Sequence, residues 1–203
     1  MKTITYNNQK ITPSKVVCIG RNYVEHIKEL GNETPDSMVI FNKPNSAISN
    51  KLNFFYDDTR YEAEICFLIK NNKIEGIGFG LDLTHASIQN KLKQKGLPWE
   101  RAKAFNGSAV FGDFIQFDGD IKDIELKLYI NNNLIQHATY NLMIYKPFDI
   151  VKEISSFMTL EDGDIIMSGT PKGVGTYKIG DIFKGEIYYN NNILISNSFI
   201  VGE

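Results

Sequence analysis

The chain has 203 residues, of which 42% are hydrophobic and 23% are charged, a composition typical of a soluble globular protein and not of a disordered or fibrous one. A chain of this length buries roughly 70% of the surface that its unfolded form exposes, so its core needs no disulfide or structural metal. The 22 Lys and Arg residues against 24 Asp and Glu residues leave a formal charge of −2, which provides no polycationic surface for a nucleic acid.

Nothing in the sequence divides the chain, since it contains no repeat, Pro/Ser-rich linker or low-complexity tail. We expect one domain over residues 1–203, with residues 1–14 as a short N-terminal extension. The N-terminus lacks the uninterrupted apolar run of a secretory signal, and no stretch reaches the ~18 apolar residues that a membrane span needs. The expected protein is therefore cytoplasmic, with no membrane partner.

Short apolar segments predict many strands along the chain. The predicted strands cover residues 16–19, 38–41, 64–69, 74–81, 126–130 and 164–167, followed by segments around Ile187 and at 193–195. Two asparagine runs, 131–133 and 190–192, separate apolar segments and are typical of hairpin turns. Cys18 and Cys66 lie in strand-like runs without a CxxC spacing, which predicts buried, reduced thiols.

Few segments have a helical pattern. Helices are predicted over residues 23–30, closed by Gly31, over 84–95, capped by Thr84 and ended before Gly96, and over 148–158. These helices do not alternate regularly with the strands, so a doubly wound parallel sheet is disfavoured. The expected fold class is mainly β with peripheral helices (α+β).

Three acidic residues at strand ends are the first candidates for chemistry. Glu62 and Glu64 share one face of a predicted strand, and this face continues into Cys66 and Leu68, so both carboxylates point toward an interior. Asp82 ends the next predicted strand. If the two strands pair, three hard oxygen ligands converge, and such a set suits Mg²⁺ or Mn²⁺. The alternative is a solvated strand end with ordinary glutamates.

Two glycine-containing segments are the next candidates. Gly78 and Gly80 share a face with Asp82, where they leave room for another backbone or a ligand. The turn at 169–175 follows a predicted strand and exposes amides and a hydroxyl that suit a carboxylate. Neither segment completes GxGxxG or GxxxxGK[ST], so nucleotide binding is not predicted.

A possible acid–base pair lies in the first predicted helix. His26 and Glu29 are i and i+3 neighbours, so the carboxylate can orient the imidazole and raise its basicity. Such a pair can deprotonate water as a general base. The alternative is an exposed pair on a helix surface, which has no catalytic role.

Together these segments resemble the fumarylacetoacetate hydrolase family, in its single-domain branch of acylpyruvase and oxaloacetate decarboxylase type. The matching motifs occur in the family's order from about residue 15 to the C-terminus. They are Gly20-Arg21-Asn22-Tyr23 with His26 and Glu29, Phe41-Asn42-Lys43-Pro44, Glu62-x-Glu64, Leu81-Asp82-Leu83-Thr84 with Gln89, Lys95-Gly96-Leu97-Pro98-Trp99 with Lys103, and Gly163-Asp164-Ile165 through Gly169-Thr170-Pro171-Lys172-Gly173-Val174-Gly175.

The resemblance implies a β-roll-type fold, a homodimer, and Mg²⁺ or Mn²⁺ as the cofactor. The implied metal ligands are Glu62, Glu64 and Asp82, the same three residues that the strand pattern selects.

The resemblance also implies roles for the remaining motif residues. His26 and Glu29 would form a water-activating dyad on a lid-like segment, and Lys103 would face the reacting oxygen as the third catalytic residue. The expected substrate-binding residues are Arg21, Tyr23, Lys43, Gln89, Gly169 and Thr170.

The chain departs from the family pattern at one place. After the metal-binding Asp this branch carries Thr-Ala-Arg-Asp, whereas this chain has Thr84-His85-Ala86-Ser87. The arginine, whose guanidinium is a bidentate clamp for a carboxylate, is absent. Either His85, Arg21, Lys43 or Lys172 takes over substrate recognition, or His85 is a surface helix residue without a role. The substrate is therefore the open question.

The expected activity is metal-dependent hydrolysis of a carbon–carbon bond in a 3-acylpyruvate or related 2,4-dioxo acid, of acylpyruvate or fumarylpyruvate type. Oxaloacetate decarboxylation or keto–enol tautomerisation, which involve a similar enolate, are the alternatives. A catalytically silent metabolite-binding relative and a β-rich interaction module are further alternatives. The expected partner is a small anionic 2-oxo or 2,4-dioxo acid.

Overall fold

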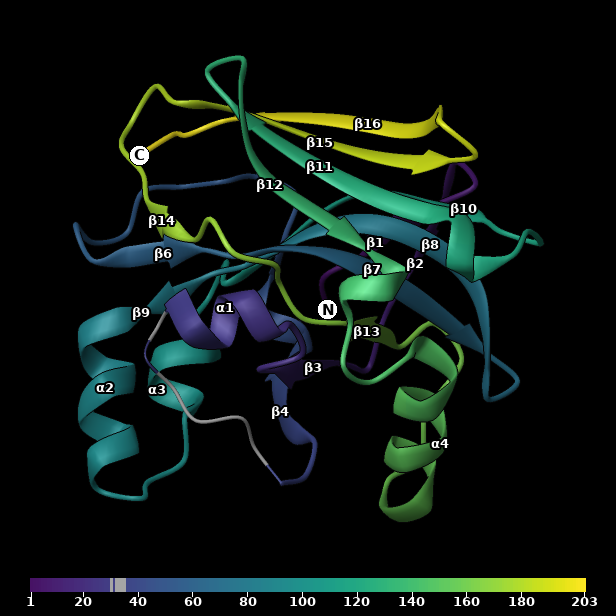
Figure 1. Cartoon of the computed structure of the whole chain (residues 1–203), viewed down its shortest axis with the longest axis horizontal. Helices are drawn as coiled ribbons and strands as arrows, with labels where there is room; N and C mark the ends of the chain where they lie inside the picture. Colours follow the sequence, from purple (N-terminus) through teal and green to yellow (C-terminus); the bar gives the residue numbers. More distant parts are fainter. Residues whose placement is uncertain (30, 32–35) are drawn as a thin grey trace.

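The strands form three sheets, of which the largest is strongly curled (Figure 1). The computed structural model describes residues 1–29, 31 and 36–203. The large sheet has the strand order β2-β1-β10-β8-β7-β13-β3-β4, with β5 paired to β10. Its strands are β1 (Ile4–Tyr6), β2 (Gln9–Ile11), β3 (Lys15–Gly20), β4 (Val39–Pro44), β5 (Ile48–Ser49), β7 (Ala63–Lys70), β8 (Lys73–Asp82), β10 (Ala109–Gln116) and β13 (Ile165–Met167).

Two smaller sheets complete the β structure. A four-stranded sheet, in the order β12-β11-β15-β16, packs across β7 and β8 of the large sheet. A three-stranded sheet has the order β14-β6-β9. Their strands are β6 (Thr59–Tyr61), β9 (Thr84–His85), β11 (Ile124–Ile130), β12 (Asn133–Thr139), β14 (Gly175–Thr176), β15 (Ile182–Tyr189) and β16 (Asn192–Ile200).

The helices are short and lie at the periphery (Figure 1). Helices α1 (Val24–Glu29), α2 (Ala86–Gln94) and α3 (Glu100–Lys103) gather at one end of the molecule, and α4 (Pro147–Phe157) lies apart from them. Three 3-10 turns are η1 (Asn45–Ala47), η2 (Ile121–Asp123) and η3 (Tyr140–Leu142). In the described part of the chain, no helix is long and apolar enough to cross a membrane. The expected fold class, mainly β with peripheral helices, is confirmed.

Pairs of asparagines make the hairpin turns. Two consecutive asparagines with positive φ join β1 to β2, β7 to β8, β11 to β12 and β15 to β16; the pairs are Asn7/Asn8, Asn71/Asn72, Asn131/Asn132 and Asn190/Asn191. A two-residue hairpin needs positive φ at both positions, and Asn adopts this conformation more readily than most residues. The predicted turns at 131–133 and 190–192 are therefore confirmed.

Strand β7 is buried on both faces. The four-stranded sheet packs on one face, and the curl of the large sheet covers the other. Ile65 and Phe67 belong to the core between the two main sheets. Cys66 belongs to a second cluster with Cys18 and Met167. Both cysteines are free, buried thiols, as predicted. The two apolar faces explain why this segment reads as a continuous apolar run.

Gly78 and Gly80 accommodate aromatic rings and not a ligand. A Cβ at Gly78 would lie 2.6 Å from the Phe114 ring. One at Gly80 would lie 2.6 Å from Cys66 Sγ and 2.9 Å from the Phe111 ring. The expectation of a ligand or backbone approach is wrong here, because the neighbouring β10 packs its phenylalanines against these positions.

Several element boundaries differ from the predicted ones. Thr84 does not cap a helix, since it belongs to β9, and α2 begins at Ala86 after His85. Helix α1 agrees with the predicted helix, whose last residue, Leu30, lies outside the described residues. Helix α3 and strands β1, β2 and β10 are unpredicted. Residues 4–11 form a hairpin whose β1 pairs with β10.

Candidate active site

Three carboxylates meet where β7 and β8 pair. The antiparallel register sets Glu64 opposite Gly80. Nearer the strand ends, the Asp82 amide donates a hydrogen bond to the Glu62 carbonyl at 2.8 Å. One carboxylate oxygen from each of the three acidic residues lies within 4.8 Å of the others. The strand pairing that the sequence left open therefore occurs, and it brings the three side chains together.

The donor set of this cluster suits a hard divalent cation. It offers carboxylate oxygens, which Mg²⁺ and Mn²⁺ prefer as ligands, and no sulfur or imidazole. Glu64 and Asp82 are buried, and like charges in a buried setting need a cation to offset their repulsion. Asp82 Oδ1 accepts no hydrogen bond from the residues that the structure describes, although Lys43 Nζ lies 2.7 Å away. The residues present therefore fit such an ion.

Glu64 is fixed by the backbone of the turn after β13. The Gly169 amide donates a hydrogen bond to Glu64 Oε2 at 2.6 Å. Burial, reinforced by the charges of Asp82 and Glu62, raises the pKa of Glu64 well above its ordinary value. Gly169 has a φ of 97°, which favours glycine, and a Cβ there would lie 2.8 Å from Asn22 Cβ. The Gly169 amide thus serves the protein's own carboxylate.

Glu62 is less buried and is fixed by two side chains. Thr84 Oγ1 donates to its Oε1 at 2.8 Å, and Lys103 Nζ donates to its Oε2 at 3.0 Å. Burial alone would raise the pKa of Glu62, but the Lys103 ammonium, His26 and Thr84 outweigh it and hold this pKa below its ordinary value. These neighbours thus favour the charged form of Glu62, which a metal ligand needs.

Lys103 is the cation at the centre of the cluster. Its Nζ donates to Asp82 Oδ2 at 2.8 Å as well as to Glu62. Burial opposes its charge, but the two carboxylates outweigh this effect and raise its pKa. Helix α3, which the sequence did not predict, carries Lys103 into the cavity. The charged ammonium is positioned to donate a hydrogen bond to a bound oxygen.

Lys43 lies behind the carboxylates and not in the cavity. It is fully buried, and its Nζ contacts Asp82 Oδ1 at 2.7 Å. Its ammonium also donates to the carbonyls of Leu83, Lys103 and Ser108. These partners satisfy a buried charge that would otherwise be very costly. The structure therefore makes Lys43 a support for Asp82, where a substrate contact was expected.

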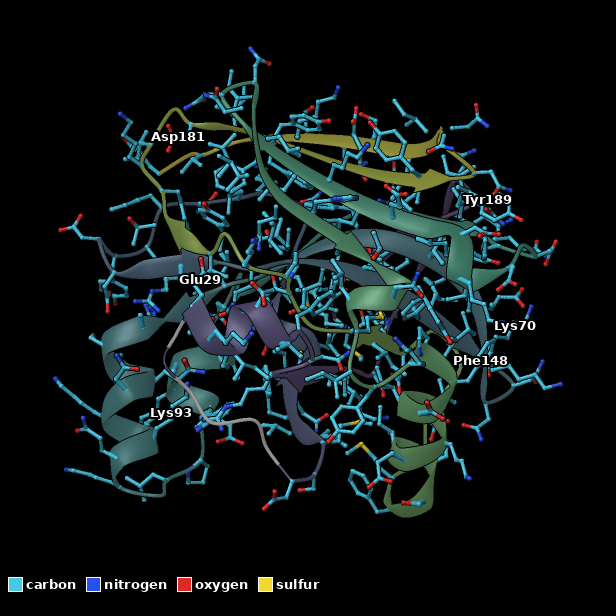
Figure 2. All side chains as sticks on the ribbon, in the orientation of Figure 1. Glu29, Lys70, Lys93, Phe148, Asp181 and Tyr189 are labelled. Carbon is cyan, nitrogen blue, oxygen red and sulfur yellow. The ribbon has the colours of Figure 1, made fainter. Side chains whose placement is uncertain are left out.

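The histidine and the glutamate of α1 pair at the cavity. His26 is 6% exposed and lines the cavity, and its Nδ1 lies 3.4 Å from Glu29 Oε2. The Gly173 amide donates to Glu29 Oε1 at 3.0 Å. Figure 2 shows Glu29 on α1, beside the segment that leads to β14. The contact with Gly173 ties the helix to the loop after β13. The exposed-pair alternative fails for His26, because its ring is buried.

One cavity collects most of the predicted site residues. Eight of them line it: Arg21, His26, Glu62, Glu64, Asp82, Gln89, Lys103 and Thr170. Thr170 Oγ1 accepts a hydrogen bond from Gln136 Nε2 at 2.9 Å. Tyr23 is buried and does not line the cavity, and its hydroxyl has no hydrogen-bond partner among the described residues. Burial and the nearby Glu64 charge raise the pKa of Tyr23.

Five further residues line the cavity, namely Ile19, Gly20, Phe41, Lys93 and Trp99. Phe41 and Trp99 form a tilted aromatic pair with ring centroids 5.8 Å apart. Phe41 and Trp99 stand in the matched motifs, but no motif marks Lys93. A signal was available, because Lys93 follows Gln89 by one helical turn and therefore shares its face of α2.

His85 is neither a surface residue nor a substrate contact. It is 5% exposed, stacks on Phe105 with a centroid distance of 4.1 Å, and meets the edge of Tyr56. Its Nδ1 lies 3.3 Å from Thr59 Oγ1, and burial lowers its pKa. His85 thus belongs to an aromatic cluster outside the cavity. Lys172 is exposed and lines a different groove.

Comparison with known proteins identifies the family. The model for the fumarylacetoacetate (FAA) hydrolase C-terminal domain matches residues 15–193. The oxaloacetate tautomerase YcgM of Escherichia coli (strain K12) is 37% identical, with 83% of this chain and 85% of that protein covered. The mitochondrial oxaloacetate tautomerase FMP41 of Saccharomyces cerevisiae is 31% identical, with 97% and 95% covered. The chain belongs to the fumarylacetoacetate hydrolase family, an enzyme family that acts on oxo acids.

A solved structure of a related enzyme has the same fold as this chain. Fumarylpyruvate hydrolase from Pseudomonas aeruginosa, crystallised with Mn²⁺ and pyruvate, superimposes with a TM-score of 0.89 at 25% identity. The match covers 99% of this chain and 95% of that one. Relatives of this chain thus include both tautomerases and a hydrolase.

Proposed function

We propose that this protein is a divalent-metal-dependent enzyme that forms the enol of a small 2-oxo acid, with keto–enol tautomerisation of oxaloacetate as its principal reaction. The observation that carries the proposal is one cavity in which three acidic residues, within 4.8 Å of one another, lie beside the buried His26, whose ring pairs with Glu29. The tautomerase relatives support the choice of reaction.

The proposed ion is Mg²⁺ or Mn²⁺, with Glu62, Glu64 and Asp82 as its ligands. A bound divalent cation would supply Lewis acidity toward the oxo acid's oxygens and so favour the enol over the ketone. The Gly169 amide, Lys43 and Thr84 hold the three carboxylates in place for this purpose.

The proton transfer is assigned to the chain's own residues. With Nδ1 of His26 facing Glu29, the lone pair for proton removal lies on Nε2. His26 would take a proton from the carbon next to the ketone, and the electron pair of the C–H bond would move to the carbonyl oxygen. Lys103 would donate a hydrogen bond to this oxygen. Return of the proton to carbon or oxygen completes the tautomerisation.

Hydrolysis of a carbon–carbon bond in a 3-acylpyruvate is the second candidate. The solved relative named fumarylpyruvate hydrolase favours it, and the same His26–Glu29 pair could deprotonate water in place of carbon. Oxaloacetate decarboxylation involves the same enolate. A silent metabolite-binding relative would bind a 2-oxo acid without turnover of any kind.

A parallel assay separates these functions. Purified protein with Mg²⁺ or Mn²⁺ is given enol-oxaloacetate, keto-oxaloacetate and acetylpyruvate, with enol absorbance, CO₂ release and pyruvate as the readouts. We expect accelerated enol–keto conversion that EDTA abolishes. If the protein forms pyruvate from acetylpyruvate faster than it tautomerises oxaloacetate, the tautomerase assignment is overturned in favour of the hydrolase. Absence of every activity would favour the silent relative.

A further inference from the structure

Lys93 is a cation in the cavity wall to which the proposed chemistry gives no role. It lies on α2, one helical turn after Gln89, and both residues line the cavity. Its Nζ lies 5.2 Å from the centroid of the Trp99 ring, a cation–π distance. Figure 2 shows Lys93 on the same side of the molecule as Glu29 of α1.

The Lys93 ammonium is poorly solvated and lacks a carboxylate partner. It is half-buried, and it forms no ion pair with a carboxylate of the described residues. Burial and the positive charge of Arg21 are the main causes that lower the pKa of Lys93 to about 8. A cation in this state gains from any anion that enters the cavity, because the anion replaces lost solvation with an ion pair.

The charges of the cavity also leave room for a further anion. With the proposed ion bound, Glu62, Glu64 and Asp82 would carry three negative charges, which Lys103 and Lys43 offset in part. A divalent cation makes the sum +1, and the carboxylate of one 2-oxo acid brings it to zero. Arg21 and Lys93 are the other cations of the cavity wall, and neither enters this count. Lys93 forms no ion pair with a carboxylate of the described residues, so a further anion can neutralise it.

We propose that Lys93 binds a second carboxylate of the substrate, so that the cavity selects dianionic 2-oxo acids over monoanionic ones. The inference rests on the proposed function, which puts the 2-oxo acid end of the substrate at the three acidic residues. The second carboxylate lies at the other end of the substrate and pairs with the ammonium on α2. Gln89, on the same helical face, is positioned beside it as a neutral hydrogen-bond donor.

Calorimetric titration of the Mg²⁺-loaded protein tests the inference without requiring turnover. The probes are pyruvate, a monoanion, and 3,3-difluorooxaloacetate, a dianion that cannot enolise. In Lys93→Met we expect the Kd of the dianion to rise about tenfold or more, with the Kd of pyruvate changed less than about twofold. Lys93→Arg should keep most of the preference. Lys91→Met, an exposed lysine on the same helix, is the matched control.

The outcomes distinguish this inference from the proposed function. Equal losses for both probes, or no loss for either, in a wild-type protein that tautomerises oxaloacetate would overturn the role of Lys93 and leave the function standing. A Lys93-dependent preference in a protein without turnover would support the second carboxylate site and overturn the tautomerase assignment. Loss of the preference in Lys91→Met would also count against Lys93.

Discussion

The acidic side of the cavity is built on the ends of two paired strands, whereas the histidine side is carried by a six-residue helix. Strand pairing positions the backbone of the acidic residues. Buried partners such as Lys43 position their carboxylate groups. Helix α1 instead depends on a few contacts, among them the one between Glu29 and the Gly173 amide. An isolated helix of this length is not stable on its own.

This difference separates two tasks within one site. The strand ends form the floor of the cavity, where buried partners hold Glu62, Glu64 and Asp82 in one geometry that suits an ion. The helix holds the acid–base group through few contacts, among them the one between Glu29 and the Gly173 amide. Substitutions on the floor should therefore affect both folding and activity, and substitutions on the helix should affect activity alone.

The largest effect is expected from Asp82→Asn. The change removes one proposed ligand and leaves the buried ammoniums of Lys43 and Lys103 short of a partner. We expect loss of tautomerase activity and destabilisation by about 3 kcal/mol, because breaking a buried ion pair strands a charge. Urea unfolding and the oxaloacetate assay measure the two effects. A stable, active variant would refute the role of Asp82 as a metal ligand and as the partner of the two buried lysines.

The second effect tests the helix side through His26→Ala. We expect turnover to fall about 10²–10⁴-fold, the usual contribution of a general base, while Mg²⁺ affinity and stability remain nearly unchanged. His137, which is exposed and pairs with Glu125, provides the control His137→Ala. If His26→Ala keeps its turnover, proton transfer must be assigned to another group.

Glu29→Gln should have a smaller effect. Glutamine retains an oxygen that can accept from the Gly173 amide but loses the charge that supports an imidazolium at His26. We expect a fall in kcat of about tenfold with KM little changed, because the charge acts mainly once His26 has taken a proton. Steady-state kinetics separate the two constants. A raised KM with normal kcat would instead indicate that Glu29 acts by holding α1 against the loop after β13.

The smallest effect concerns the pH dependence of binding at Lys93. Lys93 is charged below its pKa of about 8, so affinity for a dicarboxylate should be full below this pH and decline as the pH rises through it. The charged groups near Lys93 are Arg21, Glu62, Lys103 and Arg60. Calorimetry with difluorooxaloacetate at pH 7 and pH 9 measures the decline, and Lys93→Arg should abolish it. If affinity declines equally in Lys93→Arg, a group other than Lys93 causes the pH dependence.

The sequence predicted those features of the site that follow from local pattern. Strand alternation gave the shared face of Glu62 and Glu64, and helical spacing gave the pairing of His26 with Glu29. Features that depend on partners distant in the chain escaped it. The contact of Lys43 with Asp82 crosses from β4 to β8, and the Gly169 amide reaches Glu64 across 105 residues.

The same reasoning applies to the fold. Long apolar strands, such as β7 and β8, were predicted close to their actual bounds. Helix α3 has four residues, too few to create a periodic pattern. Thr84 reads as a helix cap in sequence, but pairing of β9 with β6 sends its hydroxyl to Glu62 instead. Tertiary contacts decided each case in which local preference was misleading.

The central claim is that three carboxylates hold one divalent ion at which a 2-oxo acid is enolised. Titration of the protein with Mn²⁺, followed by the EPR signal of the free ion, tests it most directly, with Glu64→Gln as the comparison and pyruvate added at saturation. We expect one ion per chain in the wild type, tighter binding when pyruvate is present, and neither effect in Glu64→Gln. Equal Mn²⁺ binding by both proteins, or binding that pyruvate leaves unchanged, would contradict it.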